Sequence, residues 1–130
     1  MPATWSYDYA VIRVVPRVER GEFINAGVVL YSQDAKYLDA RVHLDTERLR
    51  ALDPNLDPEA VRAHLEVARR VCEGGPGAGT VGLLPQGQRF GWLIAPRSTV
   101  VQPSPVHTGF ADNPEEAIQH LLKVMVHTPE

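Results

Sequence analysis

Two stretches of this sequence carry side chains that could bind an anion, and the first lies near the N-terminus. Glu22, Asn25 and Gly27 form the pattern Glu-x-x-Asn-x-Gly at the start of a predicted strand, and Arg13 lies on the strand before them. An arginine presents its N–H groups as a planar fork that matches a carboxylate or a phosphate. A glutamate among arginines stays ionised near neutral pH, so we expect Glu22 to bind or stabilise rather than to transfer protons.

The second stretch lies in the last third of the chain. Arg97, Ser98 and Thr99 follow a proline and offer one guanidinium and two hydroxyl groups, and His107 stands in a proline-rich loop that could hold its imidazole in place. Because an arginine remains protonated, Arg97 can clamp an anion but cannot shuttle a proton. If the two stretches meet in space, we expect Glu22 and Arg97 to form an ion pair that fixes residues 96–102 against the first hairpin.

Three other kinds of site find little support in the sequence. Ser98, His107 and Glu22 are the residue types of a hydrolytic triad, but the Gly-x-Ser-x-Gly turn is missing. The glycine-rich residues 74–79 follow a predicted helix and lack the Gly-Lys-Ser/Thr ending of a phosphate-binding loop. The histidines show no paired ligand spacing and the chain has one cysteine, so we expect no metal and no cofactor.

The elements that must position these residues begin with three predicted strands. Residues 7–15, 23–32 and 37–44 are rich in β-branched and aromatic side chains, and turn segments separate them. The second and third strands alternate in polarity, which predicts an antiparallel meander with one face in the core and the other face carrying chemistry. On the second strand the expected core face carries Ile24, Ala26, Val28 and Leu30.

Counting residues outward from the two turns predicts which side chains are neighbours. This register places Arg13 opposite Asn25 and Asn25 beside His43, so that the three form a polar row across the sheet. Gly27 lies next to the row, beside Arg41, and its missing side chain would leave room above the backbone. A cationic row beside a gap could hold a carboxylate or a phosphate. The alternative interpretation is an ordinary solvated sheet face with cross-strand pairs.

Capping residues predict the helices. Asp45 could cap a short helix that ends near Leu52, and Asp57 precedes a proline and a glutamate in a typical helix start. Apolar residues recur at helical spacing after Asp57, up to a stop at Gly74. Asn113 begins a third helix, with proline at the next position and glutamate three residues on.

The segment between the last two helices is predicted as further strands. Residues 80–84 and 89–94 flank a turn-like Pro-Gln-Gly-Gln sequence and are expected to form a hairpin, and residues 98–102 are strand-like. The order of elements favours an α+β fold, in which a largely antiparallel sheet is covered by two main helices. We expect one domain over residues 1–130.

Composition limits the classes of partner. The chain of 130 residues carries 16 acidic and 13 basic side chains, a net charge of −3, which argues against a general nucleic-acid or membrane-surface binder. We expect neither a signal peptide nor a membrane span, and the single Cys72, on a predicted helix stripe, suits a buried thiol in a cytoplasmic protein. The predicted core consists of Ile24, Val28, Leu30, Leu38, Val42, Val61, Leu65, Leu121 and Leu122.

Two segments resemble a known family. Residues 7–16 (Tyr-Asp-Tyr-Ala-Val-Ile-Arg-Val-Val-Pro) and 20–28 look like the opening of the bacterial domain-of-unknown-function family 3037, and residues 95–102 and 104–109 are similar to its second segment. The common form of the family has valine where this chain has Ala26. The resemblance implies a small stand-alone bacterial protein without an established activity. Members are often encoded beside a HipA-like kinase, which suggests a kinase partner by analogy.

Two hypotheses about function follow from these patterns. The first is a non-catalytic interaction or regulatory module, in which a sheet face or edge binds a protein partner in a toxin–antitoxin-like pair. The second is a small enzyme or ligand-binding domain for an anionic metabolite. A concave pocket shared by both family segments would favour the second hypothesis, and a flat apolar patch would favour the first.

Overall fold

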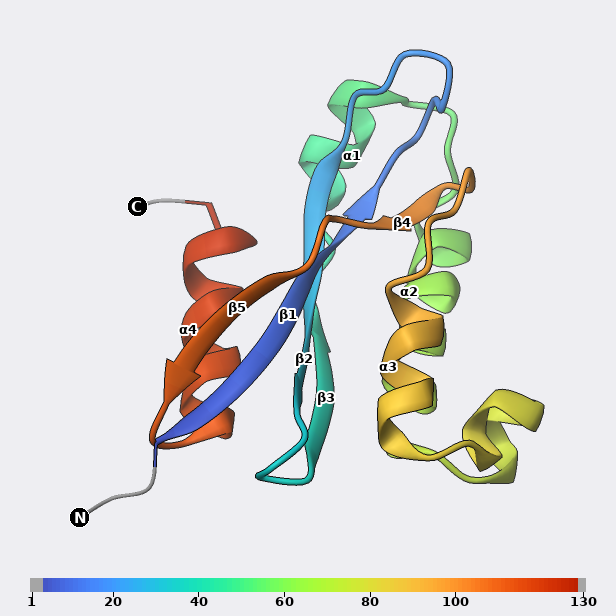
Figure 1. Ribbon diagram of the computed structural model, residues 1–130. Helices are drawn as coiled ribbons and strands as arrows, with labels where there is room; N and C mark the ends of the chain where they lie inside the picture. Colours follow the sequence, from blue (N-terminus) through green and yellow to red (C-terminus); the bar gives the residue numbers. More distant parts are fainter. Residues whose placement is uncertain (1–3, 129–130) are drawn as a thin grey trace.

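The computed structural model describes residues 4–128, and its centre is a five-stranded antiparallel sheet (Figure 1). The strands lie in the order β3-β2-β1-β4, and β5 pairs with the other part of β1, on the same edge as β4. Helices pack on both faces, so the predicted α+β class is confirmed. The strand bounds are β1 Trp5–Val14, β2 Ile24–Ser32, β3 Tyr37–Val42, β4 Val101–Pro103 and β5 His107–Ala111.

Capping side chains begin three of the helices at the predicted positions. The side chains of Asp45, Asp57 and Asn113 accept hydrogen bonds from backbone N–H groups in the first turns of α1, α2 and α4. Each such cap stabilises a helix by about 1 kcal/mol. The helix bounds are α1 Thr46–Leu52, α2 Pro58–Glu73, α3 Gln86–Leu93 and α4 Pro114–Met125, and a 3₁₀-helical segment spans Pro76–Leu83.

The predicted hairpin over residues 80–94 is wrong, because this segment is helical. The carbonyl oxygen of Pro85 accepts from the backbone N–H groups of Gln88 and Arg89, which starts α3 where a turn was expected. Phe90 and Leu93 are buried in the core on the sheet face that α2 covers. An eight-residue helix with two glycines has little intrinsic stability, so this tertiary packing decides its conformation. Likewise, the predicted loop around His107 is β5.

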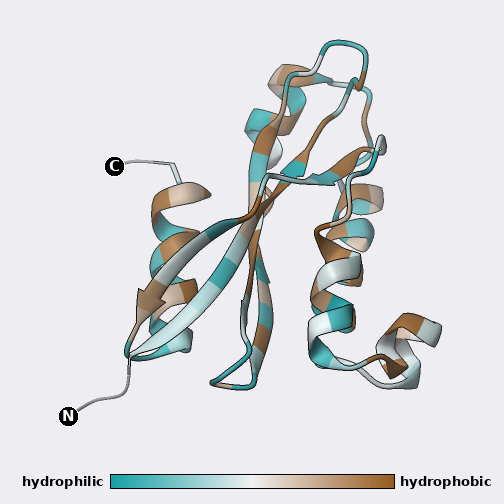
Figure 2. Ribbon diagram, in the orientation of Figure 1, coloured by the Kyte–Doolittle hydropathy of each residue, from teal (hydrophilic) through white to brown (hydrophobic). Residues whose placement is uncertain are grey.

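Two apolar clusters lie on opposite faces of the sheet. One packs between the sheet and α2 and α3, and the other packs between the sheet and α4, which stands at the left in Figure 1. In Figure 2, teal and brown segments alternate along α2, α3 and α4, as expected of helices with one buried side. The predicted core is confirmed, with Val42 and Leu122 only partly buried, but it is divided between the two faces.

A β-bulge in β2 explains why the predicted apolar stripe of this strand is divided between the two faces. The register places Ile12 opposite Gly27 but Arg13 opposite Asn25, so Ala26 is an extra residue on β2. Ile24 and Ala26 therefore face α2, whereas Val28 and Leu30 face α4. The expectation that these four residues share one face is wrong, as is the expectation of one face free for chemistry.

Cys72 lies in the core, as predicted from its place on the stripe of α2. Burial is the main cause that raises the pKa of its thiol to about 12, with a smaller contribution from Asp39. Among residues 4–128, no helix combines the length and the hydropathy that crossing a bilayer requires.

Candidate functional site

The predicted polar row is present in part, but α4 and an aromatic ring occupy its surroundings. Arg13 and Asn25 are cross-strand neighbours, as predicted. The side-chain amide of Asn25 donates a hydrogen bond to the carbonyl oxygen of Met125 at 2.9 Å, at the end of α4. The Arg13 guanidinium lies over the ring of Phe23, with 4.2 Å between Cζ and the ring centroid. These two side chains therefore hold the sheet to α4 and to the first turn.

His43 and Gly27 do not complete the row, and both register predictions for them are wrong. The backbone N–H of His43 donates to the carbonyl oxygen of Ala26, one position away from Asn25. The His43 ring packs against that of His127, with centroids 4.6 Å apart and the planes tilted by 43°. Gly27 pairs with Val42 and leaves no gap, because a Cβ there would lie 2.8 Å from the carbonyl oxygen of Arg41. The register of β2 and β3 thus leaves closely paired strands where an anion site was expected.

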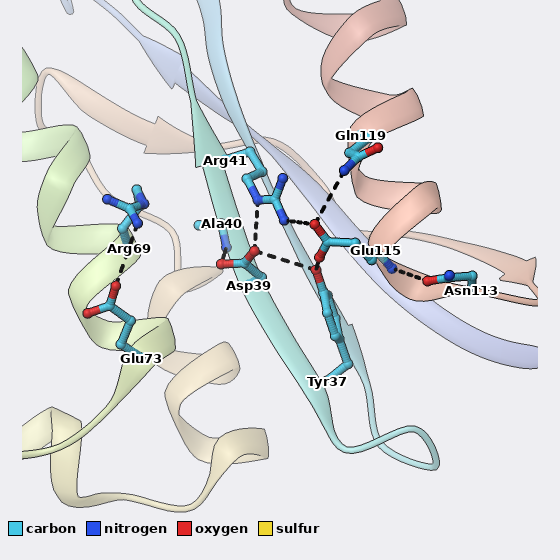
Figure 3. Close-up of polar contacts among 9 residues, drawn as sticks. All are labelled: Tyr37, Asp39, Ala40, Arg41, Arg69, Glu73, Asn113, Glu115 and Gln119. Carbon is cyan, nitrogen blue, oxygen red and sulfur yellow. Dashed lines mark hydrogen bonds and ion pairs between the residues drawn. The ribbon is translucent and has the colours of Figure 1, made fainter.

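Arg41 belongs to a polar cluster that joins β3 to α4 (Figure 3). Its guanidinium pairs with Asp39 at 2.8 Å and with Glu115, whose other carboxylate oxygen accepts from the Tyr37 hydroxyl at 2.6 Å. The hydrogen bonds from Tyr37 and Arg41 lower the pKa of the Glu115 carboxyl. Burial, followed by the bond to Glu115, raises the pKa of Tyr37. All the charges of this cluster have partners, so its role is to fix α4 on the sheet.

The two anion-binding stretches do not meet. Glu22 is exposed and pairs with Arg20, two residues away, instead of with Arg97. Ser98 is exposed in the segment that leads to β4, and His107 lies on β5 with its ring 5.4 Å from that of Tyr9. The expected ion pair between the two stretches is therefore absent from the described residues, and the groups considered for a hydrolytic triad lie on separate elements.

A cavity of about 310 Å³ lies instead on the sheet face that α2 and α3 cover. The second family segment forms one wall of it, and α2 and α3 form two others. Most lining side chains are apolar, and none is acidic. The lining residues are Ile12, Val29, His64, Val67, Ala68, Trp92, Leu93, Arg97, Thr99, Val101, Gln102 and Pro103. Ile12 belongs to the first family segment, so both segments contribute to the cavity.

Arg97 is the only lining side chain that is charged at every ordinary pH, and its position is fixed by α3. Its Nη1 donates to the carbonyl oxygen of Leu93 at 3.1 Å, and its Nη2 donates to that of Trp92 at 2.6 Å. The guanidinium also lies over the Trp92 ring, 4.4 Å from the centroid. A cation at the C-terminal end of a helix is favoured by the exposed carbonyl groups. Burial lowers the pKa of Arg97 from its usual value, although the group stays protonated at neutral pH.

The polar groups around Arg97 are held by hydrogen bonds within their own segment. The hydroxyl of Thr99 donates to the carbonyl oxygen of Val101 at 2.8 Å, and the amide of Gln102 donates to that of Thr99 at 2.8 Å. His64 reaches the cavity from α2. Of the residues predicted for an anion site, the cavity therefore includes Arg97 and Thr99, and it includes none of the first stretch.

Sequence reasoning missed Trp92, His64 and Gln102 as lining residues. The sequence predicts a strand at Trp92, and the contact of this residue with Arg97 exists only because α3 is a helix that ends between them. His64 and Val67 lie one turn apart on α2, next to the buried stripe, yet they are exposed. An exposed apolar residue beside a buried stripe is the one sequence signal that could have indicated a pocket here.

The chain was compared with known protein families, curated proteins and solved structures. Neither the curated proteins nor the solved structures include a significant match. A family profile described as "Protein of unknown function (DUF3037)" matches residues 9–126. Because this match covers most of the chain and nearly all of both family segments, the protein belongs to the DUF3037 family.

Proposed function

We propose that this protein is a non-catalytic binding domain whose ligand occupies the cavity between α2, α3 and residues 97–103. The observation that carries the proposal is the lining, in which apolar side chains from the sheet and two helices surround one fixed cation. Small-molecule sites are concave and mostly apolar, with few polar groups that orient the ligand, and they have volumes of about 300–1,000 Å³. This cavity lies at the lower end of that range, so a small ligand suits it.

The position of the cavity supports the same proposal. It lies where the two family segments approach each other, with Ile12 on one side and residues 97–103 on the other. In the first segment Asn25 is bonded to α4, and Arg13 lies over Phe23 with its buried Nε unpartnered. Neither side chain lines the cavity, so Arg97 is the cation that a ligand there would meet. The ligand-binding hypothesis is therefore preferred here over the interaction module, and no catalytic step is assigned to it.

Binding can be tested by filling the mouth of the cavity. Val67 lines it, while Ala63, one turn earlier on α2, is exposed and does not. Octanoate and 1-octanol are titrated into ¹⁵N-labelled protein while the amide resonances of residues 97–103 are followed. We expect saturable shifts from at least one probe, about tenfold weaker binding in Val67→Phe, and no more than about a twofold change in Ala63→Phe. No saturable shift from either probe, or a Val67→Phe protein that binds normally, would exclude the cavity as the site.

A protein partner is a second candidate, favoured by the exposed outer edge of the sheet. β5 pairs with β1 and with no other strand in the described part of the chain, and Phe110 on it is 71% exposed. Unpaired edges and exposed aromatic side chains are suited to adding a partner strand.

A HipA-like kinase is the partner that the family resemblance suggests. Affinity for the purified kinase should fall in Phe110→Ser and stay unchanged in the control Val124→Ser, which alters an exposed position on α4. Equal affinities of these two variants for the kinase would exclude β5 as the interface.

A further inference from the structure

The guanidinium of Arg97 retains unused hydrogen-bonding capacity beside the cavity. Its two bonds to backbone carbonyl groups use one N–H of Nη1 and one of Nη2. A guanidinium has five N–H groups, so three remain, including that of Nε. Arg97 forms no ion pair with an acidic residue in residues 4–128, where the seven ion pairs involve other arginines. Its charge is thus positioned by the protein but not neutralised by it.

The other lining groups reinforce a preference for negative charge. No aspartate or glutamate lines the cavity, and the imidazole of His64 is a further hydrogen-bonding group there. The amide of Gln102 uses one N–H on the carbonyl oxygen of Thr99 and keeps the second for a ligand. Burial disfavours the charged form of Arg97, and a bound anion would offset that cost.

The remaining surface of the cavity is apolar and favours a ligand with a hydrocarbon part. Val29, Val67, Leu93 and Val101 come from four different elements or segments, so apolar side chains surround a ligand rather than cover one side of it. A bare inorganic anion would leave this surface in contact with water, and a hydrocarbon alone would leave the guanidinium unpaired. A molecule with both parts satisfies both requirements.

We propose that the ligand is an apolar carboxylate, bound with its carboxylate on Arg97 and its hydrocarbon part between α2, α3 and the sheet. This inference rests on the proposed function and specifies its ligand class. Two N–H groups of one guanidinium can meet the two oxygens of a carboxylate, whereas an alcohol offers one oxygen and no charge. The same chemistry is found in a free aliphatic acid and at an apolar C-terminus of a peptide.

Three small probes separate the contributions of the two parts. Octanoate carries both, 1-octanol carries only the apolar chain, and acetate carries only the carboxylate. By isothermal titration calorimetry of the unmodified protein, we expect octanoate to bind about tenfold or more tightly than either of the others. A tetrapeptide that ends in a leucine with a free carboxylate is titrated in parallel with octanoate. Tighter binding of the peptide would indicate a peptide C-terminus as the ligand, and tighter binding of octanoate would indicate a free acid. Both results support the proposal.

Substitution of Arg97 tests the role of the guanidinium. Arg97→Gln should weaken octanoate binding about tenfold and leave 1-octanol binding within about twofold, whereas Arg48→Gln, on exposed α1 surface, should change neither. Because Arg97 also caps α3, the fold of each variant is checked by circular dichroism. If Arg97→Gln does not fold, the ratio of octanoate to 1-octanol affinity in the unmodified protein decides the question.

The outcomes distinguish this inference from the proposed function. Equal affinities for octanoate and 1-octanol, with no effect of Arg97→Gln, would overturn the carboxylate assignment and leave the cavity as an apolar binding site. Absence of binding by all four probes would overturn both the carboxylate assignment and the proposed function.

Discussion

The Arg97 guanidinium lies over the indole ring of Trp92, five positions earlier in the chain, and also donates to the carbonyl oxygen of that residue. The ring and the end of α3 together fix the orientation of the cation without an acidic partner in the described residues. A charge held in this way at the wall of an apolar cavity is available to a ligand.

This geometry predicts that Arg97→Lys destabilises the protein although it keeps the charge. A lysine cannot donate to two carbonyl groups in a fixed fork or stack as a plane on Trp92. We expect the free energy of unfolding in urea to fall by about 1 kcal/mol. Arg48→Lys, on the exposed side of α1, is the matched control and should leave it unchanged. If the Arg97→Lys protein is as stable as the unmodified one, the two hydrogen bonds from the guanidinium to the carbonyl groups of α3 do not stabilise the fold.

The close pairing of β2 with β3 predicts a specific sensitivity at Gly27. A Cβ at this position would lie 2.8 Å from the carbonyl oxygen of Arg41 and 3.0 Å from a methyl group of Val42, so the strands would have to move apart. We expect Gly27→Ala to lower the free energy of unfolding by about 1–3 kcal/mol. Gly91→Ala on α3 meets no atom within 4 Å and should raise it by about 0.5–1 kcal/mol. Equal effects of the two substitutions would contradict the assigned pairing of Gly27 with Val42.

The cluster around Glu115 predicts a pH dependence of stability. Its pKa is lower in the folded protein than in the unfolded chain, mainly through the hydrogen bonds from Tyr37 and Arg41. Such a carboxylate stabilises the fold fully above its unfolded pKa of about 4.3, and the contribution is lost as the pH falls through the folded value. Because the Glu115 side chain is 45% exposed, the contribution is only about 0.5–1 kcal/mol.

Urea unfolding of Glu115→Gln and the unmodified protein measures this contribution directly. The difference in their free energies of unfolding should be constant between about pH 7 and 5 and should shrink on further acidification. Glu116→Gln, an exposed neighbour on α4, controls for the loss of one carboxylate. A difference that persists unchanged at about pH 3 would show that Glu115 stabilises the fold by packing rather than by charge.

The division of the core predicts additive losses at its two sides. Leu65 of α2 is buried in one cluster and Leu121 of α4 in the other. Replacing either by alanine should lower the free energy of unfolding by about 2–5 kcal/mol, because each leaves a cavity. Since the two clusters lie on opposite faces of the sheet, the double variant should match the sum of the two losses to within about 0.5 kcal/mol. Losses below about 0.5 kcal/mol at both sites would mean that the helix faces are assigned wrongly.

The elements with explicit local signals could be predicted from the sequence. Asp45, Asp57 and Asn113 are capping residues followed by apolar residues at helical spacing, and the structure begins α1, α2 and α4 there. α3 carries no such signal: no side chain caps its start, and it contains two glycines. Its helical form depends on contacts with residues far away in sequence, such as the bonds from Arg89 to the carbonyl groups of Val71 and Cys72.

The candidate site was predictable only at Arg97 and Thr99. The polar row failed between β2 and β3, where the turn places Gly27 opposite Val42, one residue away from the predicted register. The bulge at Ala26 separately shifted the partners of β2 on β1. Counting residues in the sequence cannot distinguish a bulged strand from a regularly paired one. The cavity in turn requires the end of α3 to lie against Arg97, and the helical form of α3 was not foreseen.

A crystal structure of the protein grown with octanoate tests the central claim most directly. The account predicts electron density for the probe in the cavity, with carboxylate oxygens at about 3 Å from nitrogens of Arg97 and the hydrocarbon chain beside Trp92. Density for the carboxylate beside Arg13 and Asn25, or a cavity without density at saturating octanoate, would contradict it.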